Sequence, residues 1–353
     1  SEGDLAVYTR HKERLTFWLW FWGAFLVMGV GPSFFLDSFW QKFVTEVLIL
    51  GLLAMSSDIL IGYTGMVSFG HALFFGAGCY AAAFASIWTT PRPNLWFVLI
   101  FGTLVSGVFG IFVAYFSTRL REIYFSITTL VFSQIFWVIV LTSQWTGGEN
   151  GISFDQAYFS FFGLFPVEFG TQSFHWFVMF VVGFSYLLCR RIMRSPFGMV
   201  LQSIRENEPR TRAIGYNVEH HKMAAVMLSA LFAGLSGALY GVFNAYAAPD
   251  FFFFLLSGEI VIYNVLGGIG TLVGPIFGAM VFQFLKELLS TIWSAEYYLI
   301  PVGFLFVLMV IFMPQGPFGF FLLFLFSFFP SPPLPPPFFP SLSLPPLSLP
   351  LLS

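Results

Sequence analysis

The sequence predicts an all-α fold, namely a polytopic transmembrane helical bundle of about 8–10 spans. Its composition is the first reason: hydrophobic residues make up 58% of the 353 residues and charged residues only 9%. In soluble domains, hydrophobic residues average about 45–50% and charged residues about 25%. The mean hydropathy of +0.83 is the second reason. The third is that apolar residues gather in stretches near the roughly 20 residues that a helix needs to cross about 30 Å of hydrocarbon.

The same composition excludes several other classes of protein. A net charge of −2 leaves no basic face for a nucleic acid, and a disordered chain would carry far more charge. The two cysteines, Cys79 and Cys189, are too few for a disulfide framework or a four-ligand zinc site, so we expect no metal and no cofactor. Residues 1–14 are polar, and the apolar stretch 15–36 is too long for the core of a signal peptide.

Ten apolar stretches are candidate spans. Three of them, 66–88, 251–270 and 271–290, are interrupted by glycines, and we expect broken or re-entrant helices there. Such a backbone is tolerated within a membrane only where protein or a water-filled cavity surrounds it. The other candidates are 15–36, 43–62, 95–118, 123–141, 174–189, 223–247 and 298–313.

The basic residues predict the orientation of these spans. With ten spans, twelve of the fifteen Lys and Arg residues lie on the side of the N-terminus, which the positive-inside rule makes the cytoplasmic side. The longest loop on the other side, 142–173, carries Glu149, Asp155 and Glu168 and no Lys or Arg. We therefore expect a cytoplasmic segment at 1–14 and a transmembrane domain at 15–313.

The remaining segment, 314–353, is a tail of low complexity. From residue 320 to the last residue, every residue is Phe, Leu, Ser or Pro. All four can be encoded by pyrimidine-only codons, so a polypyrimidine tract or a shifted reading frame would give this composition, and the prolines from Pro330 onward forbid a helix. We expect this tail to be non-functional; a hydrophobic, disordered tail is the alternative.

The most charged loop, 190–222, predicts two short helices. It holds ten of the 32 charges of the chain, with both signs interleaved. Ser195 and Pro196 are typical of a helix start, as the cap and the first helical residue. Pro209 then allows a second short helix that ends near Gly215. The loop is thus expected to be a compact protrusion, although an ordinary solvated loop would have the same composition.

Five stretches of the sequence, in the same order along the chain, carry a family resemblance. They are GYTGMVSFGHALFFGAGCYAAA at 62–83, IYFSITTLVFSQI at 123–135, TGGENGI at 146–152, SPFGMVLQSIRENEPRTRAIGYNVEHHK with the following MAAVMLSALFAGLSGALYG, and VLGGIGTLVGPIFGA at 265–279. Together they resemble the LivM-type permease subunits of branched-chain amino acid ABC transporters, within the branched-chain amino acid and urea permease family. The resemblance covers about residues 43–313, and the tail departs from it.

The resemblance implies a non-catalytic permease subunit of an importer in the bacterial inner (plasma) membrane. Its implied partners are a second permease subunit in a heterodimer, two cytoplasmic ATP-binding subunits and a periplasmic or extracellular substrate-binding protein. No Walker-type G-x4-G-K-[ST] string is present, so this chain cannot hold nucleotide phosphates in that way. The loop would then dock on an ATP-binding subunit, with Gly215 permitting the turn back and contacts from Arg205, Glu206, Glu208, Arg210 and Arg212.

The interrupted spans are the expected translocation pathway. Discontinuous helices expose backbone groups that can bind a polar substrate, and glycines gather at 62–80 and 267–278. Glu259 is the best candidate for a buried acid, whereas Asp58 could snorkel or cap a neighbouring helix and Lys286 can snorkel at a span end. Neutral polar groups would suit a neutral or zwitterionic solute. The pathway candidates are Tyr63, Gly65, Ser68, His71, Thr128, Gln134, Glu259 and Asn264.

Small residues at every fourth position predict close helix packing in two spans. They are Gly102, Ser106, Gly110 and Ala114 in the fourth span, and Ala225, Ser229, Ala233, Gly237, Gly241 and Ala245 in the seventh.

Three other functions remain open from the sequence. A urea or short-chain amide permease would share the motifs. A self-contained secondary transporter would also use broken helices and buried acids, but it would have no need of a coupling loop. A membrane enzyme has little support, because there is no HExxH, no nucleophile elbow and no pair of catalytic carboxylates.

Overall fold

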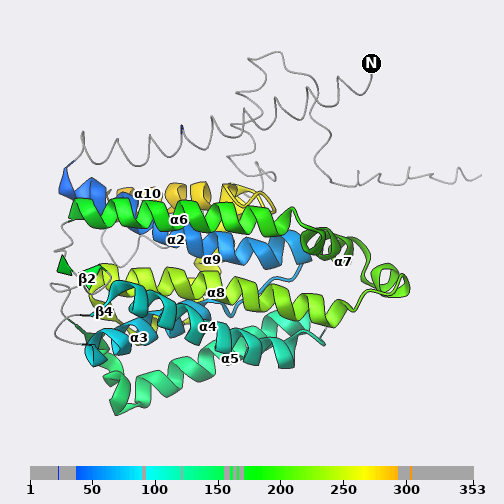
Figure 1. Ribbon diagram of the computed structural model, residues 1–353, viewed down its shortest axis with the longest axis horizontal. Coiled ribbons are helices and arrows are strands. Elements are labelled where there is room, and N and C mark those ends of the chain that lie inside the picture. The colour runs from blue at the N-terminus through cyan, green and yellow to red at the C-terminus, as the bar shows by residue number, and fades with distance from the viewer. Residues whose placement is uncertain are drawn as a thin grey trace, which may run out of the picture.

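The computed structural model describes residues 37–89, 93–120, 122–154, 160–161, 165–166 and 171–292, together with Gly23 and Gly303. Most of its long helices run along the longest axis of the molecule (Figure 1). The predicted all-α helical bundle is confirmed. The expectations for residues 1–14, 15–36, 298–313 and 314–353, and for Asp155 and Glu168, fall outside the described residues.

Six of the described helical segments are long and apolar enough to cross a membrane. Three more helices, α7, α9 and α10, complete the described part of the bundle. In chain order the helices are α2 (Ser38–Asp58) with its π-helical continuation η1 (Ile59–Thr64), α3 (His71–Trp88), α4 (Leu95–Ser117), α5 (Glu122–Thr142), α6 (Thr171–Met193), α7 (Pro196–Ala213), α8 (Val218–Asn244), α9 (Phe254–Gly267) and α10 (Gly274–Ile292).

Short strands and 3₁₀ turns lie at the end of the bundle opposite α7 (Figure 1). β1 (Ile152–Ser153) pairs antiparallel with β4 (Tyr246–Ala247), and β2 (Ser160–Phe161) pairs antiparallel with β3 (Phe165–Pro166). The 3₁₀ turns are η2 (Gln144–Thr146), η3 (Gly148–Asn150) and η4 (Pro249–Phe252). The β1–β4 pair ties the loop after α5 to the end of α8.

The interruptions expected in the glycine-rich spans are confirmed. The expected span 66–88 becomes helical only at His71, because Gly65 adopts φ +75° and ends the preceding π-helix. A second break separates α9 from α10, where Gly268 and Gly270 also have positive φ. Glycine adopts this conformation without a steric penalty. The uninterrupted stretches 95–118 and 123–141 form α4 and α5 almost as expected.

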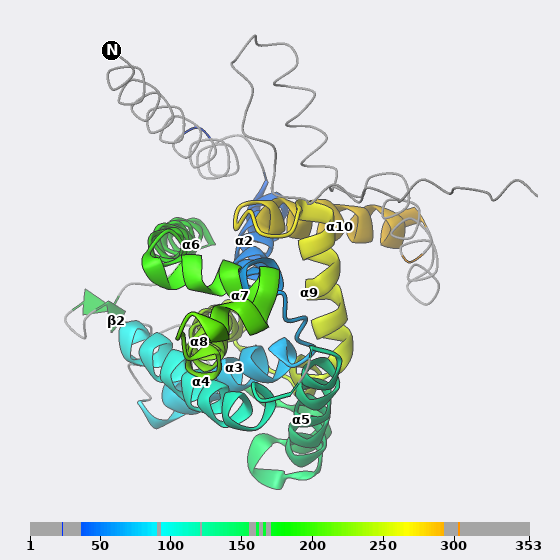
Figure 2. The same cartoon turned by 90° about the vertical axis from the view of Figure 1, so that its right-hand side faces the viewer.

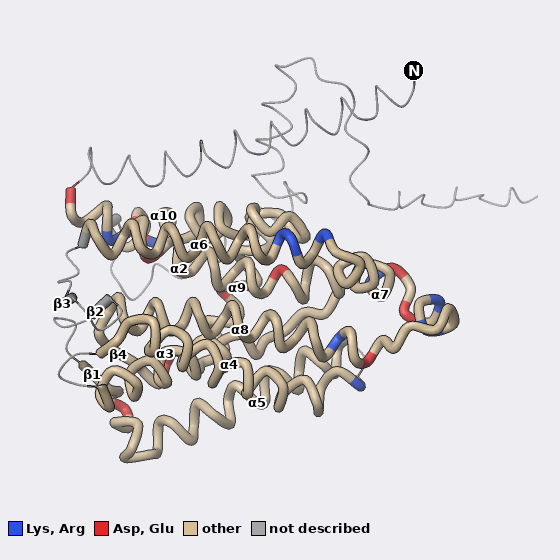
Figure 3. The backbone as a smooth tube through the Cα atoms, viewed as in Figure 1, with Lys and Arg blue, Asp and Glu red and all other residues tan. Residues whose placement is uncertain are grey.

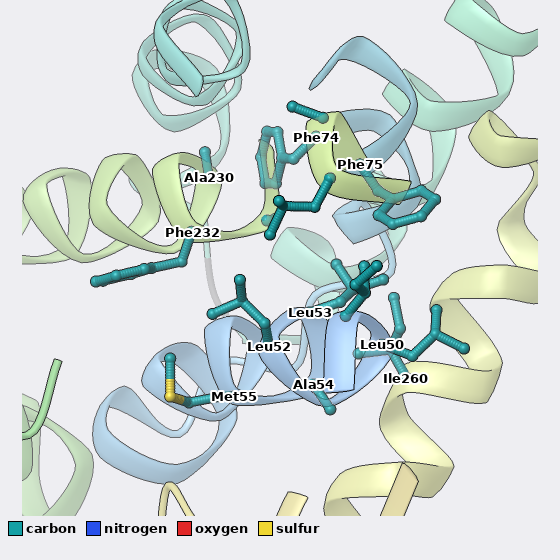
Figure 4. Packing of buried hydrophobic residues seen from close by; sticks show 14 of the residues in the cluster. Leu50, Leu52, Leu53, Ala54, Met55, Phe74, Phe75, Ala230, Phe232 and Ile260 are labelled. Carbon is teal, nitrogen blue, oxygen red and sulfur yellow. The ribbon is translucent and has the colours of Figure 1, made fainter. Parts of the chain in front are cut away.

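Helix α8 lies in the middle of the bundle and packs against α2, α3 and α4. Figure 4 shows apolar side chains of α2, α3, α8 and α9 meeting there, among them Leu53, Phe74 and Phe232. The close packing predicted for these spans is present. Gly102, Ser106 and Gly110 of α4 face Ala230, Gly234 and Ala238 of α8, whereas Gly237 and Gly241 of the predicted α8 stripe face α3. A Cβ atom placed on Gly102 would lie 2.8 Å from that of Ala238, and Gly234 faces Ser106. These glycines and alanines let the backbones approach closely.

Replacing Gly78 by valine is expected to destabilise the bundle by about 1–3 kcal/mol or more, the usual cost of overpacking. A Cβ atom there would overlap the carbonyl oxygen of Gly234 on α8, which is backbone and cannot rotate away. Thermal unfolding of the purified protein in detergent measures the effect.

Gly258→Ala is the matched control for that change. Gly258 also lies within a helix, α9, but an added Cβ atom meets nothing within 4 Å among the described residues. Alanine should leave stability unchanged or raise it by up to about 1 kcal/mol. Equal stability of the Gly78→Val and Gly258→Ala proteins would contradict the close approach of α3 and α8.

Candidate functional site

Helix α7 lies across one end of the bundle (Figure 2). Its backbone breaks at Asn207, where φ is −160° and ψ is 94°, so it consists of two short helices, as predicted. The Asn207 side chain accepts a hydrogen bond from the backbone N–H of Arg210 at 3.0 Å and thereby caps the second helix. Pro209 sits in the first turn of that second helix, where its missing N–H costs nothing.

The start and the end of α7 differ in how well the sequence predicts them. Ser195 occupies the cap position in an extended conformation, but its hydroxyl donates to the carbonyl of Ile192 at 2.6 Å and does not cap the helix. Gly215 has φ +96° and permits the turn into α8, as expected. Asn217 then caps α8 by accepting a hydrogen bond from the N–H of His220.

Three of the five expected contact residues of α7 bind within this chain. Before the break, the guanidinium of Arg205 donates a hydrogen bond to the carbonyl oxygen of Gly62 in η1. After the break, the carboxylate of Glu208 accepts from Lys222 of α8 at 2.6 Å and from Arg212 at 3.2 Å. Arg212 also lies 3.7 Å from Glu219. Helix α7 is therefore held to two different parts of the bundle.

The other two expected contact residues, Glu206 and Arg210, have exposed side chains. Neither side chain has a hydrogen bond or an ion pair with any residue in the described part of the chain. They are the charges of α7 that remain available to a partner.

The Glu208 carboxyl has an altered pKa. Partial burial raises its pKa, but the hydrogen bonds and positive charges of Lys222 and Arg212 outweigh burial, and the pKa lies below its ordinary value. Glu208 is therefore ionised at neutral pH and forms a true ion pair with Lys222, whose side chain is only 7% exposed.

The two glycine-rich segments meet at the α7 end of the bundle. The fully buried Asp58, the last residue of α2, accepts hydrogen bonds from the backbone N–H groups of Gly270 at 2.7 Å and Leu272 at 2.9 Å. A Cβ atom on Gly62 would lie 2.6 Å from the Cα atom of Gly270. Asp58 therefore takes neither of the two roles left open for it: it is buried, so it does not snorkel, and it binds the loop between α9 and α10 and not the end of a helix. The sequence offers no signal that pairs it with these partners.

His71 is a packing histidine with a satisfied ring nitrogen. Its Nε2 lies 2.8 Å from the hydroxyl oxygen of Ser229, and that hydroxyl donates its proton to the carbonyl of Ser56. Because a hydroxyl has only one proton, Nε2 of His71 must be the donor to Ser229. His71 is fully buried and links α3 to α8 and α2.

Hydroxyl groups of neighbouring helices bind the backbone around the start of α3. Thr129 of α5 accepts from the N–H of Phe69 at 3.2 Å, and Ser257 of α9 accepts from the N–H of Ala72 at 3.0 Å. The buried Ser68 accepts from the N–H of Gly70. The backbone groups that a broken helix exposes are thus paired inside the protein in this conformation.

The remaining pathway candidates are spread over three elements. Tyr63 of η1 and Thr128 and Gln134 of α5 are half-buried, whereas Asn264 of α9 is fully buried and donates to the carbonyl of Ile260. Gly65 packs against Arg205: a Cβ atom there would lie 3.1 Å from its Cγ.

Glu259, the best candidate for a buried acid, is only partly buried. Its side chain is 24% exposed, pairs with Lys286 of α10 at 3.3 Å and accepts from the hydroxyl of Tyr263 at 3.2 Å. Lys286, expected to snorkel, is the partner. The pair joins residues 27 positions apart across the break between α9 and α10. Helical periodicity does not extend across a break, so the sequence pattern could not predict this pair.

A helical membrane bundle with interrupted helices and a charged helix pair at one end defines a membrane transport protein of the permease type. A family model described as branched-chain amino acid transport system, permease component, matches residues 40–313. The match covers most of the chain, and the chain belongs to this family.

Curated relatives agree with the family model. The high-affinity branched-chain amino acid transport system permease proteins LivM of Salmonella typhimurium and of Escherichia coli are each 28% identical over 314 residues, which covers 83% of this chain and 73% of theirs. The probable branched-chain amino acid transport permease protein LivM of Methanocaldococcus jannaschii is 25% identical over 277 residues, which covers 68% of this chain and 78% of its own. No solved structure matches this chain significantly.

Proposed function

We propose that the chain is the permease subunit of an ATP-driven importer and forms the translocation pathway for branched-chain or related hydrophobic amino acids. The observation that carries the proposal is α7: a kinked, charged helix pair anchored to the bundle by Arg205 and Glu208, with Glu206 and Arg210 exposed. An element of this kind can pass a rigid-body movement of a docked partner to the bundle. A self-contained transporter has no use for it.

Polar side chains around the start of α3 support the proposed class of solute. They are the hydroxyl groups of Ser68, Thr129 and Ser257 and the imidazole of His71. Neutral hydrogen-bond donors and acceptors of this kind suit a zwitterion, whereas an ion would be bound better by a charged side chain of the opposite sign. The family and the printed names of the relatives favour an amino acid over urea or an amide.

The charges favour one orientation of the bundle. Lys and Arg residues gather at the α7 end (Figure 3), and the positive-inside rule puts that end in the cytoplasm. ATP-binding subunits would dock there, two to a complex. A substrate-binding protein would approach the end that carries β1 and β4, and a second permease subunit would complete the pathway in a bacterial inner membrane. The chain itself would catalyse no reaction.

Replacing Glu206 and Arg210 together by alanine tests the proposal. If these charges bind an ATP-binding subunit, their loss should cost about 2–5 kcal/mol of docking, so co-purification of that subunit and uptake of leucine should both fall. Membrane abundance should stay normal, because exposed substitutions usually change stability by less than about 0.5 kcal/mol. Tagged permease, purified with its partners, gives the docking measurement.

Gln202→Ala with Ser203→Ala is the matched control, since both residues are exposed and uncharged on the same helix. Normal co-purification and uptake in the Glu206, Arg210 variant would make α7 an ordinary solvated loop. Uptake that continues without ATP-binding subunits would indicate a secondary transporter, and competition by urea or acetamide in place of leucine would indicate the amide-importing alternative.

A further inference from the structure

Three elements of the chain meet at one point near α7. They are the end of α2 with η1, the loop 268–273 between α9 and α10, and the first half of α7. We call this point the junction and define it as Asp58, Gly62, Arg205, Gly270 and Leu272. The junction joins the two interrupted segments to α7, the helix on which an ATP-binding subunit docks in the proposed function.

The contacts within the junction are polar and specific. Asp58 holds the loop through the N–H groups of Gly270 and Leu272, at 2.7 and 2.9 Å. Arg205 holds the carbonyl of Gly62, one turn after Asp58, and its Nη1 atom would lie 3.8 Å from a Cβ atom on Gly270. Movement of Arg205 would therefore act on both interrupted segments.

The carbonyl of Gly62 is a favourable place for such a contact. It belongs to a π-helical turn at the C-terminal end of a long helix, where carbonyl groups carry partial negative charge and attract a cation. π-helical turns interrupt regular helices and occur often at functional sites. A hydrogen bond from an arginine there is charge-assisted and stronger than a neutral one.

Helix α7 does not need Arg205 in order to stay attached to the bundle. Its buried face consists of Val200, Leu201 and Ile204, and its second half is tied to α8 by the ion pair of Glu208 and Lys222. Helix α7 packs against α6, α8 and η1. Arg205 alone among the charged residues of α7 contacts an interrupted segment within the described part of the chain.

We propose that Arg205 is a positioning residue that transmits the movement of α7 to the two interrupted segments through the carbonyl of Gly62, so that the junction gates the α7 end of the pathway. This inference rests on the proposed function, because it needs a partner that moves α7. In the conformation described, Arg205 and Asp58 hold η1 and the loop 268–273 against each other. This arrangement is the closed state of the α7 end of the pathway.

Arg205→Ala tests the proposal in the complete transporter, with its ATP-binding subunits and binding protein, in proteoliposomes. The variant should co-purify with the ATP-binding subunits as the wild type does and should still hydrolyse ATP. Leucine uptake per ATP hydrolysed should fall about tenfold or more, the effect of losing a hydrogen bond to a charged group. Arg205→Lys, which keeps a cationic donor on a flexible stem, should recover part of the ratio.

The control is Ser203→Ala, two residues away on the exposed side of α7. An unchanged uptake-to-hydrolysis ratio in Arg205→Ala would overturn the inference and leave the proposed function standing. Loss of the ATP-binding subunits from that variant would also overturn it, because Arg205 would then be a docking contact. If Arg205→Ala fails to insert into the membrane, Arg205→Lys and Arg205→Gln replace it. An unchanged ratio of uptake to ATP hydrolysis in both of these variants would overturn the inference. Wild-type uptake without ATP would instead refute the proposed function.

Discussion

Replacing Asp58 by alanine is expected to destabilise the bundle by about 2–6 kcal/mol and to abolish transport. The substitution removes the acceptor of two buried backbone N–H groups, on Gly270 and Leu272. Each buried donor left without an acceptor costs about 1–3 kcal/mol. The loop 268–273 would lose its attachment to α2, and Leu272 would no longer be held at φ +62°. Thermal unfolding in detergent and solute uptake in vesicles measure the two effects.

Asp58→Asn should lie between the wild type and Asp58→Ala. The amide oxygen can accept from one of the two N–H groups, but the amide nitrogen faces the other donor. The control is Ser57→Ala, on the same helix and equally buried, because the Ser57 hydroxyl has no hydrogen-bond partner among the described residues. A loss of stability in Ser57→Ala as large as that in Asp58→Ala would show that burial, and not the two hydrogen bonds, sets the cost.

The continuous helices of this fold could be predicted from the sequence. α4 and α5 begin and end within about two residues of the apolar stretches, because hydrophobic length largely decides their limits and Asn94 caps the start of α4. The expected span 66–88 begins five residues before α3. Residues 66–70 continue the apolar stretch, but Gly65 in the left-handed region and the hydrogen bonds to Thr129 and Ser126 hold them outside the helix.

The division of α7 into inward and outward charges could not be predicted. In an unbroken helix, Arg205 and Glu208 are three residues apart and share one face. The break at Asn207 resets the phase of the helix, so Arg205 turns to η1 and Glu208 to α8. Pro209 indicates a break in the helix at or near that residue. It does not show the direction that the chain takes after the break.

The glycine clusters were predicted to line a pathway, and in this conformation they serve close packing. Gly70 faces Thr129, Gly76 faces the ring of Phe252, and Gly62 faces Gly270. The two clusters nonetheless come together, which the sequence could not establish because Asp58 and Leu272 lie 214 residues apart. A contact at that separation depends on how the whole bundle packs, and no local pattern encodes it.

Replacing Glu208 by alanine is expected to destabilise the α7 region by about 2–3 kcal/mol. Lys222 is nearly buried, so the loss of its carboxylate partner leaves an ammonium group without compensation. Breaking a fully buried ion pair costs about 3–5 kcal/mol. The cost here should be lower, because the Glu208 side chain is 37% exposed and water can reach the site. Hydrogen exchange of the α7 and α8 amides measures this local stability.

The double variant Glu208→Gln, Lys222→Met separates the pair from the general effect of altering the loop. It removes both charges and should recover most of the lost stability, since methionine fills the space of the lysine stem and buries no charge. Additive losses from the two single changes would contradict a direct interaction, because independent sites add and interacting sites do not. Glu219→Ala, at the more distant 3.7 Å contact with Arg212, should change little.

The ion pair should also make the attachment of α7 depend on pH. The pKa of Glu208 is lower in the folded protein than in the unfolded chain, because Lys222 and Arg212 favour the carboxylate more than partial burial disfavours it. Its contribution to stability is therefore complete above the unfolded value of about 4.3 and is lost as the pH falls through the lower, folded value. Between neutral and strongly acidic pH, the protection of the α7 amides relative to their intrinsic exchange rates should fall in the wild type and should change much less in the Glu208→Gln, Lys222→Met protein. An equal loss of protection in both proteins would assign the acid sensitivity to other carboxylates and would contradict the role of this pair in holding α7 to α8.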